Sequence, residues 1–200
     1  YIGSVLRARI EAMGARAIGV DKMPPKDDAT DGQIFDLCDS ALTSKVMTDH
    51  SPGCVIHAGT HSAIAYRDDF LRAFKEDACA LVNILEALRA VPETRLIFYS
   101  SSYVYSGLDP DVVVDEGSTL NPRHNFGVAK SFFERLIRGT HPSSVIFRLS
   151  SVFGHGPQKH PNAVAAMATE CIEHGRLTVW GEGRRRMQYI YLDDVVSSTL

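Results

Sequence analysis

The sequence predicts a doubly wound α/β fold, in which helices cover both faces of a parallel sheet. Short apolar runs of strand length alternate along the chain with longer stretches whose apolar residues recur at helical spacing. Strands that alternate with helices need crossover connections, and crossovers place consecutive strands parallel to one another. The chain has 200 residues, 44% of them hydrophobic and 22% charged, which suits one globular domain or a little more.

Five strands are expected in the first three quarters of the chain, each an apolar run that a turn or a loop ends. They cover residues 17–20, 33–36, 54–57, 96–99 and 144–149. A long helix is expected over about 68–90, where apolar residues recur at helical spacing before Pro92. A second helix is expected over 126–138, and Gly139 closes it. Together these elements indicate a Rossmann-like domain in residues 1–150.

Beyond Gly154 the pattern loosens, and a further helix with short strands over 177–180 and 189–191 is expected. These residues, 151–200, look like the start of a small substrate-binding lobe. The first residues read as a helix already begun, and another helix begins near Asp193. We therefore expect an incomplete stretch of a longer protein, with a strand before the first residue and more chain after the last.

Composition narrows the functions that the chain can have. The net charge is −3 and no basic block is present, which argues against nucleic acid as a partner. No apolar run approaches the roughly 20 residues that cross a membrane, so we expect no membrane partner. The four cysteines show no Cys-x-x-Cys spacing, and a metal role for His57 is not expected. Buried free thiols, a cytoplasmic location and no metal site are therefore expected.

The candidate active-site residues are a cluster of serine hydroxyls and a lysine. The strand over 96–99 runs into three serines centred on Ser101, and the second helix places Lys130 four residues after Phe126. Residues four apart share one face of a helix, so we expect Phe126 and Lys130 to point the same way. A serine-rich turn that only caps a strand is the alternative for the hydroxyls, and Lys130 makes it the weaker one.

This arrangement resembles that of the extended short-chain dehydrogenases, the NAD-dependent sugar-nucleotide epimerases and dehydratases. The resemblance implies that Ser101 holds the substrate hydroxyl and that Lys130 binds the cofactor beside it. In that family a tyrosine in the place of Phe126 moves the proton. The resemblance therefore implies an enzyme without its proton-shuttling oxygen, either through engineering or in a lineage that has shed chemistry. Tyr103 and Tyr105 are candidates to replace it, although the family pattern gives Tyr105 a packing role.

The same resemblance implies NAD as the cofactor. Gly3, preceded by Ile2, matches the last glycine of a Gly-x-x-Gly-x-x-Gly loop that faces the pyrophosphate at a helix N-terminus. Asp21 follows the first strand as the ribose-binding acid does, which favours NAD over NADP. An ordinary turn aspartate is the alternative for Asp21, and the neighbouring Lys22 could soften the preference.

Two later stretches extend this match to the cofactor site. Asp36 and Leu37 resemble the pair that meets the adenine, while a helix N-cap is the alternative and Asp39 suits that cap better. The family has a stretch whose backbone lines the cofactor, and it is matched here by His57, Ala58 and Gly59. We expect the His57 side chain itself to be packed and hydrogen-bonded.

The substrate side is matched less closely. The resemblance implies that His61 and Ser102 face the substrate, and that Ser151 stands where an asparagine often touches a nucleotide-sugar. Arg186 stands one residue before the arginine that grips the diphosphate, and Met187 occupies that position itself. A solvated basic turn is the alternative for the arginines around Arg186.

Three functions remain open. The first is an NAD-dependent epimerase or dehydratase that acts on a nucleotide-activated sugar. The second is a non-catalytic NAD-binding protein, and the third is a reductase or dehydrogenase on a non-nucleotide carbonyl. The resemblance also implies a homodimer through the two predicted helices, because Phe70, Phe74, Phe132 and Phe133 look exposed on them.

Overall fold

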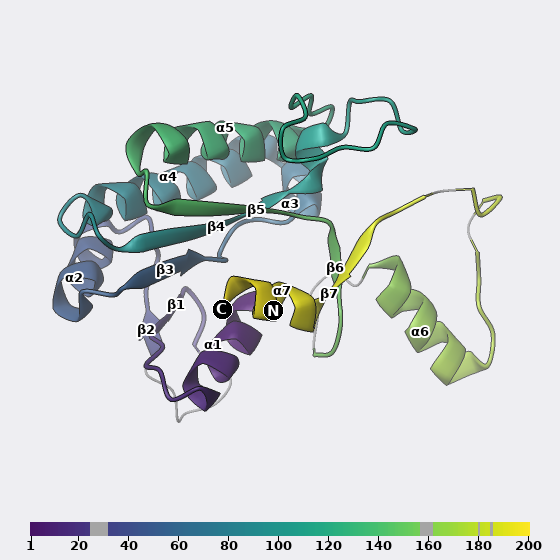
Figure 1. Cartoon of the computed structure of the whole chain (residues 1–200). Helices are drawn as coiled ribbons and strands as arrows, with labels where there is room; N and C mark the ends of the chain where they lie inside the picture. The colour runs from purple at the N-terminus through teal and green to yellow at the C-terminus, as the bar shows by residue number, and fades with distance from the viewer. Residues whose placement is uncertain (25–31, 157–161, 180, 185) are drawn as a thin grey trace. The chain divides into compact units, whose positions relative to one another are not determined.

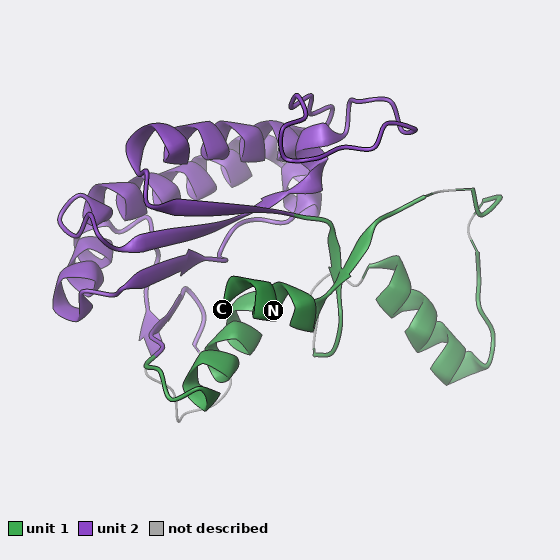
Figure 2. Cartoon of the chain, in the orientation of Figure 1, with its two compact units in different colours: residues 1–16, 149–200 green, residues 17–148 purple. Residues whose placement is uncertain are grey.

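The computed structural model describes residues 1–24, 32–156, 162–179, 181–184 and 186–200 of the chain. The chain divides into two compact units (Figure 2). The larger unit consists of residues 17–148, and the smaller one combines residues 1–16 with residues 149–200.

Strands and helices alternate in the larger unit, as the sequence predicts (Figure 1). Its elements along the chain are β1 (Gly19–Asp21), β2 (Gly32–Ile34), α2 (Ser40–His50), β3 (Cys54–His57), α3 (Ala63–Asp68), α4 (Phe70–Leu88), β4 (Arg95–Ser101), the 3-10 turn η1 (Ser102–Tyr105), α5 (Asn125–Thr140) and β5 (Ser144–Leu149), which leads out of the unit.

The strands of this unit form two sheets. β1 and β2 pair in parallel, and β3, β4 and β5 form a three-stranded sheet in that order. β3 and β4 are also parallel, with His57 opposite Phe98. α4 and α5 lie along one face of the three-stranded sheet (Figure 1). The α/β class with parallel strands is therefore confirmed, and the second covering layer of a doubly wound fold stays a prediction.

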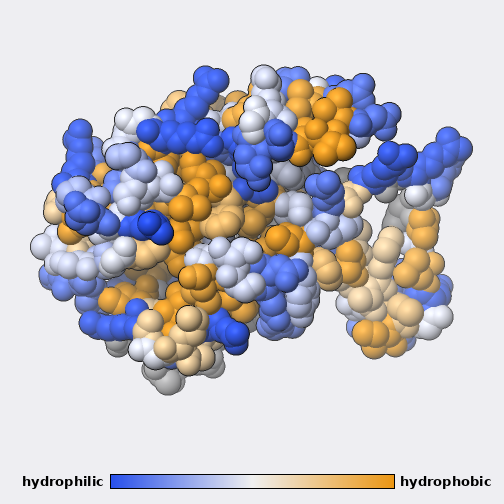
Figure 3. All heavy atoms as spheres, in the orientation of Figure 1, coloured by the Kyte–Doolittle hydropathy of each residue, from blue (hydrophilic) through white to orange (hydrophobic). Residues whose placement is uncertain are grey.

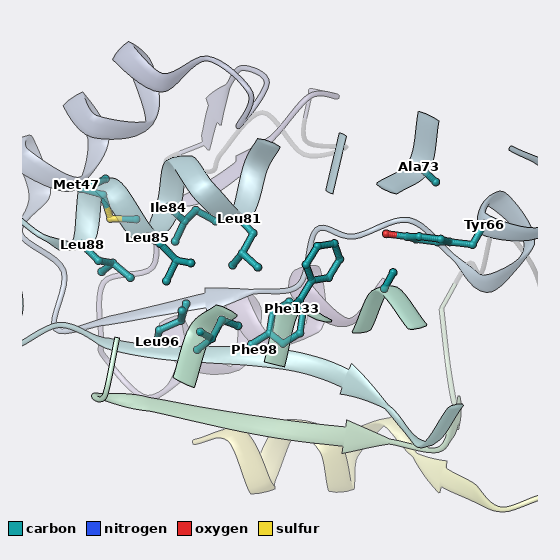
Figure 4. Packing of buried hydrophobic residues seen from close by; sticks show 13 residues of the cluster. Met47, Tyr66, Ala73, Leu81, Ile84, Leu85, Leu88, Leu96, Phe98 and Phe133 are labelled. Carbon is teal, nitrogen blue, oxygen red and sulfur yellow. The ribbon is translucent and has the colours of Figure 1, made fainter. Parts of the chain in front are cut away.

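The core fills the space between α4, α5 and the three-stranded sheet. Leu81, Ile84 and Leu88 lie on one face of α4 at helical spacing, and all three are buried. Figure 4 shows them above Leu96 of β4 and beside Phe98 and Phe133. The spacing that predicts this helix therefore also identifies the face that it buries.

The expectation that Phe133 is exposed is wrong. Its ring is fully buried, stacked on Phe74 at 5.6 Å between centroids and edge-on to Phe98. Phe70 and Phe74 are partly buried against the same core. Only Phe132 keeps half of its surface exposed, at 49%. Phe132 and Phe133 both lie near the apolar face of α5. The rotation of this helix against α4 decides which of the two rings is buried.

Aspartate caps set where the helices begin. The helix predicted over about 68–90 is α4 and begins at Phe70, because the Asp69 carboxylate accepts a hydrogen bond from the Arg72 N–H and separates α4 from the short helix α3 before it. Asp39 caps α2 through the Leu42 N–H at 3.0 Å, as its sequence context favours. The Asp36 carboxylate instead accepts from the Cys38 N–H inside the preceding turn.

The smaller unit contains α1 (Ile2–Ala12), β6 (Ser151–Phe153), α6 (Ala163–His174), β7 (Tyr189–Tyr191) and α7 (Leu192–Thr199). β6 and β7 pair in parallel, and α7 contacts α1 and both strands. The expected strand over 177–180 is wrong for residues 177–179, which are irregular, and Trp180 lies outside the described residues. A strand needs a partner for its backbone, and no described neighbouring segment pairs with this apolar run.

α6 exposes much of its apolar surface. None of its residues is buried, and Ile172 is 84% exposed. Figure 3 shows hydrophobic residues gathered over this helix. No helix in the described parts of the chain is long and apolar enough to span a membrane.

A close backbone approach fixes where α5 begins. A Cβ atom on Gly127 would stand 2.3 Å from the carbonyl oxygen of Tyr103 and 2.8 Å from its carbonyl carbon. No side chain fits at those distances, so the first turn of α5 packs directly on η1 only because this residue is glycine. Gly127 lies between Phe126 and Lys130 in sequence and therefore positions both against the end of β4.

We expect Gly127→Ala to lower the free energy of unfolding by about 1–3 kcal/mol, because the added methyl overpacks this contact. Gly139→Ala is the matched control in the same helix, where nothing lies within 4 Å of the added atom. It should raise stability by up to about 1 kcal/mol, because alanine favours helix over glycine. Urea unfolding followed by circular dichroism measures both, and equal midpoints for the two variants would contradict the prediction.

Candidate active site at the carboxyl ends of the strands

The predicted site residues of the larger unit follow the carboxyl ends of its parallel strands. Asp21 ends β1, His57 ends β3 and Ser101 ends β4. Asp36 and Leu37 follow β2 by two and three residues. In open α/β sheets ligands bind at this edge, so the topology places these side chains where a ligand is expected.

Lys130 is buried in α5 with 2% of its surface exposed. Its Nζ donates one hydrogen bond to the Tyr99 carbonyl at 2.8 Å and one to Thr60 Oγ1 at 2.9 Å. An ammonium has three N–H donors, and the described residues engage two of them, which leaves one for a ligand. Burial lowers the pKa of Lys130 to about 8, and the carboxylates of Asp77 and Glu134 oppose that change. The side chain therefore remains mostly charged at neutral pH.

Phe126 and Lys130 come together as the helical spacing predicts. The ammonium lies over the Phe126 ring at 5.4 Å from its centroid and over the Phe98 ring at 4.7 Å. Ring faces attract cations, which helps to offset the loss of water around the buried charge. The Phe126 ring also meets two tyrosine rings edge-on, Tyr66 at 5.5 Å and Tyr103 at 5.7 Å.

The serines at the end of β4 have different roles. Ser101 is 8% exposed, and its Oγ accepts a hydrogen bond from the Tyr103 N–H at 3.3 Å, which caps η1. Ser100 points into the protein and donates to the Glu134 carboxylate. Ser102 opens η1 and is partly buried. Capping leaves the Ser101 hydroxyl hydrogen available, so the structural role and the predicted substrate contact are compatible.

A buried ion pair lies behind these serines. The Glu134 carboxylate is fully buried and receives three hydrogen bonds from the Arg148 guanidinium at 2.7–3.1 Å. Arg148 also donates to the Tyr105 hydroxyl, which itself donates to the Asp115 carbonyl. Hydrogen bonding to Glu134 is the main reason that the pKa of Arg148 rises further above its usual value. Tyr105 therefore packs and bridges, in line with the packing role implied by the sequence.

A second buried carboxylate, Asp77 of α4, holds His61. The two oxygens of Asp77 accept from the His61 backbone N–H at 3.1 Å each, and Oδ1 lies 2.7 Å from His61 Nδ1. The Tyr66 hydroxyl donates to Oδ2 at 2.8 Å. On its other side His61 Nε2 faces the Glu76 carboxylate at 3.3 Å. His61 is thus fixed between two acidic groups, with 26% of its side chain exposed.

Asp77 and Glu134 were not among the residues predicted from the sequence. Each lies on the apolar face of its helix, Asp77 between Ala73 and Leu81 and Glu134 beside Phe133. A carboxylate at a core position is costly to bury without partners. An acidic residue at a position of the helix that is otherwise apolar was the available signal that these two carboxylates are buried. The groups that bind them come from distant segments of the chain, which no local pattern reveals.

At the other strand ends, Asp21 and Asp36 carry the carboxylates expected to meet a cofactor. Asp21 is exposed and accepts from the Met23 N–H at 3.0 Å. Asp36 pairs with Lys22, whose Nζ lies 2.8 Å from Oδ2. Hydrogen bonding to Lys22 is the main reason that the pKa of Asp36 falls below its usual value. Leu37 packs against the core, and its carbonyl accepts from the Asn83 amide.

The end of β3 suits a polar ligand. His57 is packed against Phe98, as expected, and burial lowers its pKa to about 4, with Lys130 adding to the effect. The hydrogen bond expected for this side chain is not formed at Nε2, which is buried without a partner among the described residues. Ala58 follows, and then Gly59, where no atom lies within 4 Å of the position of a Cβ. His57 Nε2 lacks a partner and Gly59 has free space around it, two separate features that are compatible with the backbone-lined cofactor stretch that the sequence implies.

Four predicted residues belong to the smaller unit. Ile2 and Gly3 open α1, and Ser151 in β6 pairs with Tyr189 and accepts from the Asn162 amide at 3.5 Å. Arg186 lies in the irregular segment before β7. Pro157 and Gln158, which end the glycine-containing stretch that follows Ser151 in the sequence, lie outside the described residues, and so does Arg185 beside Arg186. The structure leaves the roles expected for these residues as predictions.

Metal ligands are not clustered in the described parts of the chain. No group of three or more His, Cys, Asp or Glu side chains there could hold an ion. All four cysteines are free thiols, although Cys54 and Cys171 are exposed rather than buried.

Comparison with known proteins identifies relatives across the whole chain. A family model described as "NAD dependent epimerase/dehydratase family" matches residues 1–200. A probable UDP-glucuronate 4-epimerase of Rhizobium meliloti is 22% identical over 99% of this chain and 64% of its own length. A dTDP-glucose 4,6-dehydratase of Streptomyces niveus is 26% identical over 80% of this chain and 48% of its own length. The chain thus spans about half to two thirds of these relatives.

Solved structures share the fold. UDP-glucose 4-epimerase of Thermotoga maritima superposes with a TM-score of 0.88 at 20% identity, covering 99% of this chain and 68% of that one. L-threonine dehydrogenase of Clostridium difficile reaches the same TM-score of 0.88 at 16% identity, and the match covers 98% of this chain and 66% of that one. At such identities the likeness establishes the fold and leaves the substrate open.

Proposed function

Because this chain belongs to the NAD dependent epimerase/dehydratase family, we propose that it is the NAD-binding part of an epimerase or dehydratase that acts on a nucleotide-activated sugar. The observation that carries the proposal is the buried ammonium of Lys130 beside the end of β4. The described residues accept hydrogen bonds from two of its three N–H groups. The relatives named as acting on UDP- and dTDP-sugars support the substrate class.

The proposed roles divide the chain's own residues between substrate and cofactor. Ser101 holds the C4 hydroxyl of the sugar, and Lys130 binds the nicotinamide ribose while keeping a positive charge beside the reacting atoms. NAD, when bound, supplies the hydride acceptor of this chemistry. Phe126 keeps the ring of the usual proton shuttle and lacks its oxygen, so this sequence is impaired at that position unless another group moves the proton.

The carboxylates support NAD as the cofactor rather than NADP. Asp21 is exposed at the end of β1, where it would accept hydrogen bonds from both ribose hydroxyls and repel a 2′-phosphate. Lys22, the cation that could soften this preference, is engaged by Asp36 at 2.8 Å. The remaining cofactor contacts are proposed for Ile2, Gly3, Asp36, Leu37, His57, Ala58 and Gly59. In this division residues 1–150 hold NAD and residues 151–200 begin the substrate lobe.

His61, Ser102, Ser151 and Arg186 are proposed to meet the substrate, with Arg186 on the diphosphate. A non-catalytic NAD-binding protein is the main alternative, because Phe126 removes the usual acid–base group. A dehydrogenase on a non-nucleotide carbonyl is the other, and the fold likeness to L-threonine dehydrogenase is compatible with it. The free thiols support a cytoplasmic location.

A homodimer is proposed through α4 and α5, the helices on the outer face of the three-stranded sheet. Leu71 is 76% exposed on α4, and Val128 and Phe132 are exposed on α5. Apolar side chains on two adjacent helices would be buried if a second copy packed against them.

If this face pairs two copies, the protein should have twice its monomer mass in light scattering at micromolar concentration. Phe132→Asp should shift the mass to that of a monomer, because a charge at a buried contact is unfavourable. Ile172→Asp adds the same charge to an exposed residue of α6 and should leave the mass unchanged. A monomeric unmodified protein would refute the dimer.

The cofactor assignment predicts that NAD binds more tightly than NADP in calorimetry on the full-length protein. Asp21→Asn should weaken NAD binding about tenfold or more, since hydrogen bonds to a charged group contribute about 1.5–3 kcal/mol each. Asp49→Asn changes an exposed aspartate of α2 and should have no effect. Equal or tighter binding of NADP by the unmodified protein would overturn the role of Asp21.

The substrate proposal is tested by Phe126→Tyr. A phenol restored beside Lys130 should raise turnover of UDP- or dTDP-sugars by about 10²–10⁴-fold, the usual contribution of an acid–base group. Turnover is followed as sugar product or as transient NADH absorbance. Phe132→Tyr adds the same oxygen to an exposed ring of α5 and should bring no gain. A Phe126→Tyr protein that binds NAD and turns over none of these sugars would count against the proposed function.

A further inference from the structure

The proposed roles leave the buried Asp77 carboxylate without a function. It is 3% exposed, and four donor contacts surround its oxygens, three from His61 and one from Tyr66. The His61 backbone N–H and the Tyr66 hydroxyl donate to these oxygens, as a carboxylate that only accepts requires. A buried charge held in this way orients what is bonded to it, and here that is the imidazole of His61.

The contact with Asp77 decides which nitrogen of His61 is basic. A carboxylate only accepts, so the 2.7 Å contact assigns the ring proton to Nδ1. In the neutral ring Nε2 then carries the lone pair, and the side chain is 26% exposed. The Glu76 carboxylate, 3.3 Å from Nε2, would stabilise the ring once a proton is gained. An imidazole oriented by a carboxylate through Nδ1 is the arrangement in which histidine serves as an acid–base group.

His61 is tied to the same lysine and ring as the candidate active site. The residue before it, Thr60, accepts a hydrogen bond from Lys130 Nζ at 2.9 Å. Tyr66, which shares the Asp77 carboxylate, packs edge-on against Phe126 at 5.5 Å. Around the His61–Asp77 pair, the described charged or titratable groups include Glu76 on α4 with its partners Lys22 and Arg72, Lys130 on α5, and His57 at the end of β3.

The neighbouring phenols are weaker candidates for proton transfer. Tyr66 is buried and donates to a carboxylate, and burial first and Asp77 second raise its pKa far above its usual value. The Tyr105 hydroxyl is occupied by Arg148 and the Asp115 carbonyl. Tyr103 touches Phe126, but no described contact joins its hydroxyl to Lys130. A phenol needs a cation beside it to act near neutral pH, and an imidazole does not.

We propose that His61, oriented by Asp77, is the proton-transfer group of this site and takes the place of the oxygen absent from Phe126. The inference rests on the proposed function. NAD, when bound, would supply the hydride acceptor and donor. His61 Nε2 would take the proton of the substrate hydroxyl as its O–H bond breaks and the C=O bond forms, and would return that proton when the hydroxyl forms again. Asp77 is a positioning residue.

Turnover tests the catalytic role of His61. We expect the unmodified full-length protein to turn over a UDP- or dTDP-sugar with NAD, and His61→Gln to lower kcat by about 10²–10⁴-fold with little change in KM. His124→Gln is the matched control, an exposed histidine whose ring lies against Tyr103. It should keep kcat within about twofold. Added imidazole should restore part of the activity of His61→Ala.

Nitrogen-15 NMR of the imidazole tests the pair without turnover. His61 should show the tautomer protonated at Nδ1, and Asp77→Asn should redistribute the proton between the two nitrogens. Asp77→Glu keeps a carboxylate at this position and should restore the Nδ1–H form. A variant that had merely lost its fold would show no such recovery. An Nε2–H tautomer in the unmodified protein would overturn the proposal, because Nε2 would then have no lone pair to accept the substrate proton.

Phe126→Tyr separates failure of this inference from failure of the proposed function. If Phe126→Tyr is active while the unmodified protein is inactive, His61 does not transfer the proton and the proposed function stands. An active unmodified protein in which His61→Gln keeps its kcat leads to the same conclusion. If neither form turns over any of these sugars although NAD binds, the proposed function falls and the inference falls with it.

Discussion

The buried ammonium of Lys130 is the constraint on which the rest of the larger unit depends. A charge 2% exposed to solvent needs fixed partners, and they come from the Tyr99 carbonyl of β4, from Thr60 after β3 and from two aromatic ring faces. Two buried carboxylates, Asp77 on α4 and Glu134 on α5, add attraction that opposes the cost of burial. Satisfying one cation therefore fixes α4 and α5 over the ends of β3 and β4.

Each of those carboxylates carries its own set of partners, which extends the constraint outward. Glu134 binds Arg148 of β5 and Ser100 of β4, so the third strand is tied to α5. Asp77 binds His61 and Tyr66, so the loop after β3 and α3 are tied to α4. Paired polar groups of this kind hold buried charges in place, and here the pairs join α3, α4 and α5 to β4, β5 and the loop after β3.

The sequence predicted what local patterns encode and missed what distant segments supply. β3, β4, β5 and the Phe126–Lys130 pair follow from apolar runs and helical spacing, and the structure contains them. Glu134 and Asp77 escaped notice because their partners lie up to 34 residues away in the chain. The burial of Phe133 was misjudged because spacing cannot separate two adjacent rings. The strand expected over 177–179 failed because an apolar run does not reveal whether a partner strand exists.

The packing of the Phe126 ring has an evolutionary consequence. The ring meets Tyr66 and Tyr103 with its edges and lies under the Lys130 ammonium, so an aromatic side chain is required there for architecture alone. Phenylalanine and tyrosine codons differ by one base. Selection on the shape of this pocket therefore preserves the ring through generations in which its oxygen is not needed, and a single mutation can return it. Residue 126 can therefore lose and regain its hydroxyl group in evolution without a change in the packing around it.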